Sequence, residues 1–157
     1  MSIQVGQTAP DFSLVRNPGE NPVSLSDFGG QKNVVLLFFP LAWSSVCTAE
    51  LCSTRDSYQQ YGDLDAEVVG ISVDSPFALQ AWSREQSFPF PLLSDFNKDV
   101  SKSYGALFED LMGFRGVSKR AAFVIDKSGV VRYAEVLESA GDQPNFDAIR
   151  EVLGQLS

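Results

Sequence analysis

The stretch VVLLFFPLAWSSVCTAELC, residues 34–52, decides the fold because it joins an apolar strand to the start of a helix. Residues 34–39 are six apolar side chains without alternation, rich in β-branched and aromatic types, which is typical of a strand buried on both faces. Pro40 is predicted to end this strand. A helix is predicted from about Ser45 to about Tyr61, because hydroxyl residues able to cap it stand at its start and no glycine or proline interrupts it.

Both cysteines of the chain, Cys47 and Cys52, fall in this predicted helix, and Cys47 lies in its first turn. Free backbone amides and the positive end of the helix dipole stabilise an anion there, which favours the nucleophilic thiolate. The alternative is that Cys47 is a small buried hydrophobic residue, the usual role of a free cysteine. The order of strand, proline, hydroxyl and helix start favours a reactive thiol.

The composition excludes several other kinds of protein. A length of 157 residues is that expected for a single domain, residues 1–157, with a core of its own. The net charge of −8 argues against a nucleic-acid-binding surface. The chain has no histidine, which excludes Ser-His and Cys-His catalysis and, with only two cysteines, argues against zinc. We therefore expect no metal or cofactor, and an arginine, a lysine or the helix itself must activate Cys47.

The same features indicate where the protein resides. The longest apolar run is far too short to span a membrane, and residues 1–6 lack the basic and apolar regions of a signal peptide. Two closely spaced cysteines do not make a secreted disulfide scaffold and point to redox chemistry instead. We therefore expect a cytoplasmic protein that binds neither membranes nor nucleic acid.

Apolar patterns and turn signals predict alternating strands and helices along the rest of the chain. The expected strands are 12–14, 23–25, 67–73, 121–125 and 130–136, and the expected helices are 76–86, 98–104 and one that begins at Asn145. The first two strands are expected to form a hairpin, as are the last two. The sequence thus predicts an α/β fold with a central mixed β-sheet flanked by helices and an N-terminal β-hairpin extension.

The spacing of Pro40, Ser44 and Cys47 is similar to the Pro-x-x-x-Thr/Ser-x-x-Cys motif of the peroxiredoxins, thiol peroxidases with a thioredoxin-like fold. Other segments that resemble this family occur in family order, at residues 9–12, 25–27, 70–75, 90–95 and 120–126. The Cys-x-x-x-x-Cys spacing of Cys47 and Cys52 resembles the bacterioferritin-comigratory, or peroxiredoxin Q, branch. The surrounding sequence also resembles one-cysteine alkyl hydroperoxide reductase E proteins.

This resemblance implies reduction of hydrogen peroxide and organic hydroperoxides through a sulfenic acid at Cys47. It implies that Pro40 shields the thiolate, that Ser44 positions the peroxide, and that Arg120 stabilises the thiolate and polarises the O–O bond. The spacing of Cys52 predicts that it resolves the sulfenic acid as a disulfide. The family also implies a thioredoxin-type reductant and often a homodimer.

Three features keep two interpretations each. Glu50 is predicted either to orient Arg120 or to be an ordinary solvated carboxylate on the helix surface. Trp43 is either part of an apolar collar around the thiol or a core or interface aromatic. Residues 105–116, which carry several apolar side chains among glycines, form either an exposed rim for dimerisation or reductant docking or a satellite core.

Three other functions compete with a two-cysteine peroxidase. The first is a one-cysteine enzyme resolved by an external thiol, with Cys52 inert in the core. The second is a thiol-disulfide oxidoreductase, which is expected to carry Cys-x-x-Cys rather than the longer spacing found here. The third is a non-catalytic thioredoxin-fold module that binds a partner through residues 105–116.

Overall fold

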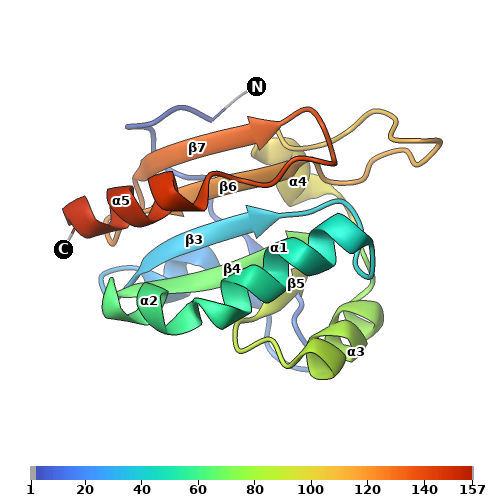
Figure 1. Cartoon of the computed structure of the whole chain (residues 1–157), viewed down its shortest axis with the longest axis horizontal. Helices are drawn as coiled ribbons and strands as arrows, with labels where there is room; N and C mark the ends of the chain where they lie inside the picture. The colour runs from blue at the N-terminus through green and yellow to red at the C-terminus, as the bar shows by residue number, and fades with distance from the viewer. Residues whose placement is uncertain (1–2, 157) are drawn as a thin grey trace.

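A five-stranded mixed sheet in the order β5-β4-β3-β6-β7 forms the centre of the computed structural model, which describes residues 3–156 (Figure 1). Its strands are β3 (Asn33–Phe38), β4 (Ala66–Ser72), β5 (Leu92–Ser94), β6 (Arg120–Ile125) and β7 (Val131–Leu137). β3 pairs in parallel with β4 and antiparallel with β6, so the apolar stretch of the sequence is the central strand.

Helices and an N-terminal extension cover the two faces of this sheet. The helices are α1 (Ser45–Asp56), α2 (Tyr58–Asp63), α3 (Pro76–Gln86), α4 (Asp99–Ser103) and α5 (Phe146–Leu156). In Figure 1, α1, α2 and α5 lie in front of the sheet and α4 lies behind it. An antiparallel hairpin of β1 (Ser13–Leu14) and β2 (Val23–Ser24) leads into a 3₁₀ helix, η1 (Leu25–Phe28). The predicted architecture is confirmed.

Both faces of β3 are buried, as its unbroken apolar run predicted. Val34, Leu36 and Phe38 pack into a core shared with the N-terminal segment and α4. The alternate residues Val35 and Leu37, followed by Phe39, pack into a second core beneath α1, α3 and α5. Because side chains alternate along a strand, one strand serves two cores. The end of β3 is thus fixed between two cores, and Pro40 follows it at the carboxyl edge of the sheet.

The predicted helix over 45–61 is wrong in one respect, because the chain forms two helices there. α1 ends at Asp56 and α2 begins at Tyr58, with Ser57 between them at φ −106° and ψ 9°. After this break the Tyr58 hydroxyl donates to Glu67 at 2.8 Å, and Tyr61 is buried against the sheet. These tertiary contacts decide the change of direction, and helix propensity carries no information about them.

β5, a strand of three residues, Leu92–Ser94, was not predicted; it follows Pro91 and pairs in parallel with β4. A run this short carries no detectable period. The other elements agree with prediction to within a few residues. One such difference matters for the site, because Arg120 is the first residue of β6 rather than the residue before it.

Candidate active site

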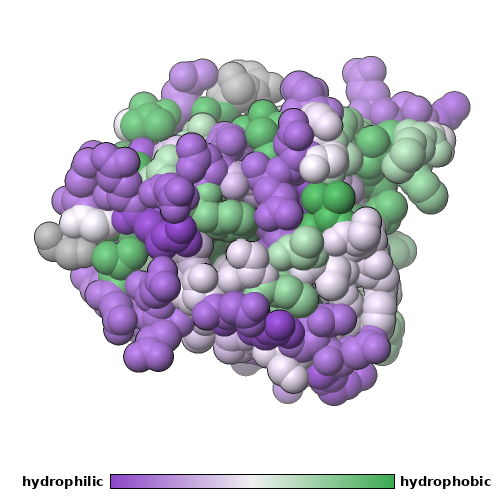
Figure 2. Space-filling model, in the orientation of Figure 1, coloured by the Kyte–Doolittle hydropathy of each residue, from purple (hydrophilic) through white to green (hydrophobic). Residues whose placement is uncertain are grey.

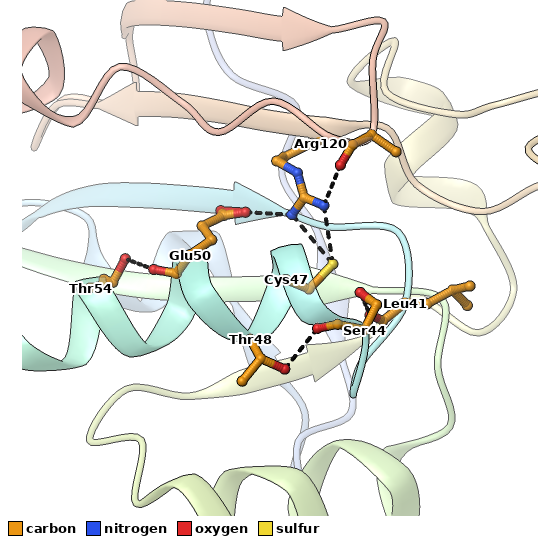
Figure 3. Close-up of polar contacts among 8 residues, drawn as sticks. Leu41, Ser44, Cys47, Thr48, Glu50, Thr54 and Arg120 are labelled. Carbon is orange, nitrogen blue, oxygen red and sulfur yellow. Dashed lines mark hydrogen bonds and ion pairs between the residues drawn. The ribbon is translucent and has the colours of Figure 1, made fainter.

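Cys47 lies at the carboxyl edge of the sheet, in the first turn of α1, and is 1% exposed. Ser44 is the N-cap residue of this helix, but its hydroxyl makes no capping bond, so the predicted capping role is wrong. The hydroxyl instead donates to the carbonyl oxygen of Leu41 at 2.8 Å, as Figure 3 shows. This bond closes the loop between Pro40 and Ser44 into a turn that leads directly to Cys47.

Arg120 is brought to Cys47 by the pairing of strands. β6 runs antiparallel to β3 with Ala121 opposite Phe38, so the start of β6 lies beside the end of β3. Both terminal nitrogens of Arg120, Nη1 and Nη2, donate to Cys47 Sγ at 3.3 Å (Figure 3). The arginine is 1% exposed. A guanidinium in this position favours an anionic sulfur beside it.

Two further groups hold the guanidinium in place. Glu50, one turn along α1 from Cys47, is fully buried and accepts from Arg120 Nη1 at 2.6 Å. The carbonyl oxygen of Ala140, in the segment between β7 and α5, accepts from Nη2 at 2.9 Å. The predicted contact between Glu50 and Arg120 is confirmed, and the solvated alternative for Glu50 is wrong. Sequence reasoning missed Ala140, which acts through its main chain and therefore leaves no side-chain signal.

The charges in this cluster are unbalanced. Burial raises the pKa of Glu50 from 4.5 to about 7, although the charge of Arg120 and its hydrogen bond lower it. Burial also acts to lower the pKa of Arg120, but the charges of Glu50 and Cys47 and their hydrogen bonds raise it overall. The raised pKa of Glu50 favours its neutral form, whereas the raised pKa of Arg120 favours its charged form. The two shifts therefore disagree about whether the ion pair is charged on both sides.

One cation serving two potential anions explains this difference. The guanidinium stays charged because either anion stabilises it, whereas burial disfavours a negative charge on Glu50. The second carboxyl oxygen of Glu50, Oε2, is buried and has no hydrogen-bond partner among residues 3–156, so no such bond compensates its loss of water. Glu50 therefore takes up a proton near neutral pH, far above the usual range of a carboxyl group.

A cavity of about 350 Å³ opens beside the cluster and is predominantly apolar. Its walls are Pro40, Leu41, Ser44, Ser45, Val46, Leu111, Met112, Arg120, Ala140 and Gly141. The segment 105–116 contributes an exposed rim, with Met112 81% and Phe114 52% exposed, while Ala106 is buried in the core. The segment is thus part exposed rim and part buried core, and its role in dimerisation or reductant docking stays a prediction. Figure 2 shows apolar surface at this end of the molecule among predominantly hydrophilic groups.

Trp43 belongs to the same loop but does not line this cavity. Its side chain is 51% exposed, and its ring centroid lies 6.5 Å from that of Trp82 on α3. The structure thus places Trp43 at the surface beside α3 rather than in the collar around the thiol.

Cys52 is separate from the site although it shares α1 with Cys47. It is half-buried, and its thiol donates to Gln86 Oε1 at 3.4 Å. Both cysteines are free thiols. The structure therefore brings Pro40, Ser44, Cys47 and Arg120 together and leaves Cys52 outside the cluster.

No group of three or more Cys, Asp or Glu side chains suited to a metal ion occurs within residues 3–156. Over the same residues, none of the helices has the length and apolar character needed to cross a bilayer.

Residues 5–134 match the AhpC/TSA family. The chain is 40% identical over 136 residues to alkyl hydroperoxide reductase E of Mycobacterium bovis, which covers 85% of this chain and 86% of that protein. It is 39% identical over 145 residues to the chloroplastic 2-cysteine peroxiredoxin of Chattonella marina var. antiqua, covering 87% and 72%. The crystal structure of peroxidoxin BcpB from Mycobacterium tuberculosis superposes with a TM-score of 0.86 at 31% identity, covering 99% of both chains. The chain therefore belongs to the AhpC/TSA family and is a thiol-dependent peroxidase of the peroxiredoxin type with a thioredoxin-like fold.

Proposed function

We propose that Cys47 is the peroxidatic nucleophile and that Arg120 is the residue that activates it. The observation that carries this assignment is the pair of bonds from Arg120 Nη1 and Nη2 to Cys47 Sγ, each 3.3 Å long. Arginine suits this place because its charge is permanent and its planar fork can contact the sulfur and an incoming oxygen together. In a buried site such fixed donors stabilise developing charge without reorganisation.

The proposed reaction is a displacement at oxygen. The thiolate of Cys47 attacks the terminal oxygen of a hydroperoxide, so an S–O bond forms as the O–O bond breaks. The sulfur is oxidised to a sulfenic acid, and the peroxide is reduced to an alkoxide or hydroxide that takes a proton from water. Arg120 stabilises the leaving oxygen, Ser44 contributes its hydroxyl to peroxide positioning, and Pro40 shields the sulfur from solvent.

The cavity supports organic hydroperoxides as substrates in addition to hydrogen peroxide. Leu41, Val46, Leu111 and Met112 form an apolar wall that opens onto Arg120. An alkyl chain against this wall is removed from water, whereas hydrogen peroxide gains nothing from it. We therefore propose that the rim of Leu111 and Met112 raises the reactivity of alkyl hydroperoxides selectively.

Cys52 is proposed to resolve the sulfenic acid, and this step requires α1 to open. Residues five apart in an intact helix are separated by a rise of about 7.5 Å and face different sides, beyond the reach of a disulfide. The first turn of α1 has no side-chain cap at Ser44, which lowers the barrier to unwinding it. Once the turn opens, Cys52 attacks the sulfenic sulfur, the S–S bond forms and water leaves. A thioredoxin-type dithiol would then reduce this disulfide.

A one-cysteine mechanism is the second candidate, because the Cys52 thiol is hydrogen-bonded to Gln86 and lies outside the cluster around Cys47. In that case an external thiol reduces the sulfenic acid directly. The relatives include both an alkyl hydroperoxide reductase E and a 2-cysteine peroxiredoxin, so they do not separate the two mechanisms.

Intact-mass analysis after one equivalent of peroxide separates these mechanisms. Under the two-cysteine proposal the wild-type protein loses about 2 Da and both free thiols, and the Cys52→Ser variant stops at a gain of about 16 Da. A wild-type protein that gains about 16 Da and keeps a free Cys52 thiol would establish the one-cysteine mechanism. A Cys47→Ser variant that still consumes peroxide would refute Cys47 as the nucleophile.

A further inference from the structure

Asp74, two residues after β4, lies at the carboxyl edge of the sheet next to the loop that leads to Cys47. Its carboxylate oxygen Oδ2 accepts from the main-chain amide of Ala42 at 2.8 Å and from the hydroxyl of Ser72 at 2.7 Å. The hydroxyl of Ser94 donates to its carbonyl oxygen at 2.6 Å. Asp74 thus links the segment after β3 to the ends of β4 and β5. The peroxidase chemistry described above assigns no role to it.

We propose that Asp74 is a positioning residue for the peroxidase reaction, and that its carboxylate holds the loop from Pro40 to Ser44 in its reactive conformation. The inference rests on the proposed role of Cys47 as nucleophile.

The backbone of this loop needs an external restraint. Trp43 has φ +73°, a left-handed conformation that a residue with a side chain adopts at a cost in free energy. Such a conformation persists when surrounding contacts determine it more strongly than the local preference opposes it. The Ala42 amide, one residue earlier, is fixed by Asp74, and the Ser44 hydroxyl, one residue later, is fixed by Leu41.

The same network continues to the strand that carries Arg120. The carbonyl oxygen of Ser72 accepts from the Asp95 amide at 2.7 Å. The carboxylate of Asp95 accepts from the amide of Ser101 at 2.6 Å, and the hydroxyl oxygens of Ser101 and Ser118 lie 2.7 Å apart. Ser118 stands two residues before Arg120. One hydrogen-bonded network across the sheet edge therefore supports both the loop before Cys47 and the segment that leads into β6.

Loss of the acceptor at Asp74 has a defined consequence. The Ala42 amide then has to find water, and Trp43 can relax to a right-handed or extended backbone. Either change moves Ser44 and the first turn of α1 relative to Arg120, which is held by the carbonyl oxygen of Ala140 and by Glu50, one turn further along α1. A displacement of about 1 Å between reacting groups costs up to about 100-fold in rate.

The test compares Asp74→Ala with Asp74→Asn, whose amide oxygen can still accept from Ala42 and Ser72. Stopped-flow oxidation of Cys47 by an organic hydroperoxide is expected to slow by about 10- to 100-fold in Asp74→Ala and to return close to the wild-type rate constant in Asp74→Asn. Asp126→Ala is the matched control. Asp126 also accepts from main-chain amides, those of Ser128 and Val130, in the turn at the opposite end of the sheet. This variant is expected to lose thermal stability and keep the wild-type rate constant.

Two results would overturn the proposal, namely an Asp74→Ala protein that reacts at the wild-type rate or an Asp74→Asn protein as slow as Asp74→Ala. If Asp74→Ala does not fold, hydrogen exchange of the Ala42 amide in the wild-type protein decides. The bond to Asp74 predicts that this amide is protected. Exchange at the rate of a free amide would refute the proposal. The proposed function fails separately, in a wild-type protein whose Cys47 is not oxidised by peroxide at all.

Discussion

Replacement of Glu50 with Gln is expected to change the pH dependence of stability in a specific direction. Glu50 is fully buried, and burial raises its pKa from 4.5 to about 7. Between these values the folded protein holds the Glu50 proton and the unfolded chain has released it. The folded state then binds more protons, so the free energy of unfolding falls as pH rises through this window and levels off above it. At about 1.4 kcal/mol for each pH unit, the total is about 3 kcal/mol.

Urea denaturation of the reduced proteins at intervals from pH 4.5 to 7.5 measures this contribution, with the fluorescence of Trp43 and Trp82 as the signal. The stability of the wild type relative to Glu50→Gln is expected to decrease by about 3 kcal/mol over this range. Taking the difference at each pH removes the titration of groups that both proteins share. Asp56→Asn, on the exposed part of the same helix, controls for the loss of one negative charge.

A constant difference between the two proteins from pH 4.5 to 7.5 would show that Glu50 stays ionised in the folded state. The buried cluster would then hold the Glu50 carboxylate beside Arg120 without penalty, and the reasoning from its burial would be refuted. If the stability of the wild type relative to Glu50→Gln instead increased with pH, the reasoning would be refuted more strongly. That result would mean that the folded state stabilises the Glu50 carboxylate.

Three further predictions concern the reaction, the cavity and the core. Arg120→Met is expected to slow oxidation of Cys47 by about 100- to 1,000-fold in stopped-flow measurements, and an unchanged rate would make Arg120 structural only. Met112→Glu, at the exposed rim, is expected to lower the rate constant for long-chain alkyl hydroperoxides but not for hydrogen peroxide; equal losses for both would exclude an apolar substrate contact. Gly70→Ala is expected to destabilise the fold by about 1 to 3 kcal/mol in thermal unfolding, because its Cβ would lie 2.6 Å from Leu92 Cδ2. A wild-type melting temperature in that variant would show that Leu92 can move aside.

Local patterns in the sequence were sufficient for most of the elements. The unbroken apolar run at 34–39 predicted a strand buried on both faces, and the structure confirms it. The predicted helix over 76–86 coincides with α3, whose start at Pro76 is capped by the Ser75 hydroxyl, which accepts from the amide of Ala78 at 3.2 Å. These signals are readable because side chains within a few residues of one another determine them.

The sequence failed where a distant contact overrides a local preference. The division between α1 and α2 at Ser57 follows the packing of Tyr58 and Tyr61, and β5 exists only because β4 offers it a pairing edge. The hydroxyl of Ser44 was predicted to cap the helix, yet it bonds to Leu41 instead. The first two outcomes depend on groups far away in the chain, whereas Leu41 is a local acceptor three residues before Ser44 that competes with capping.

For the candidate active site, the sequence alone predicted the reactive thiol, its place at a helix start after a buried strand, and, through resemblance, the choice of Arg120. Only the tertiary structure decided that Arg120 reaches Cys47 across 73 residues of chain, that Glu50 and Ala140 hold it there, and that Cys52 lies apart from it. The spacing of cysteines along a helix is set by its pitch, so it can be read from the chain. The meeting of α1 with the start of β6 depends on the order and direction of strands in the sheet, which hydrogen bonds between distant segments establish.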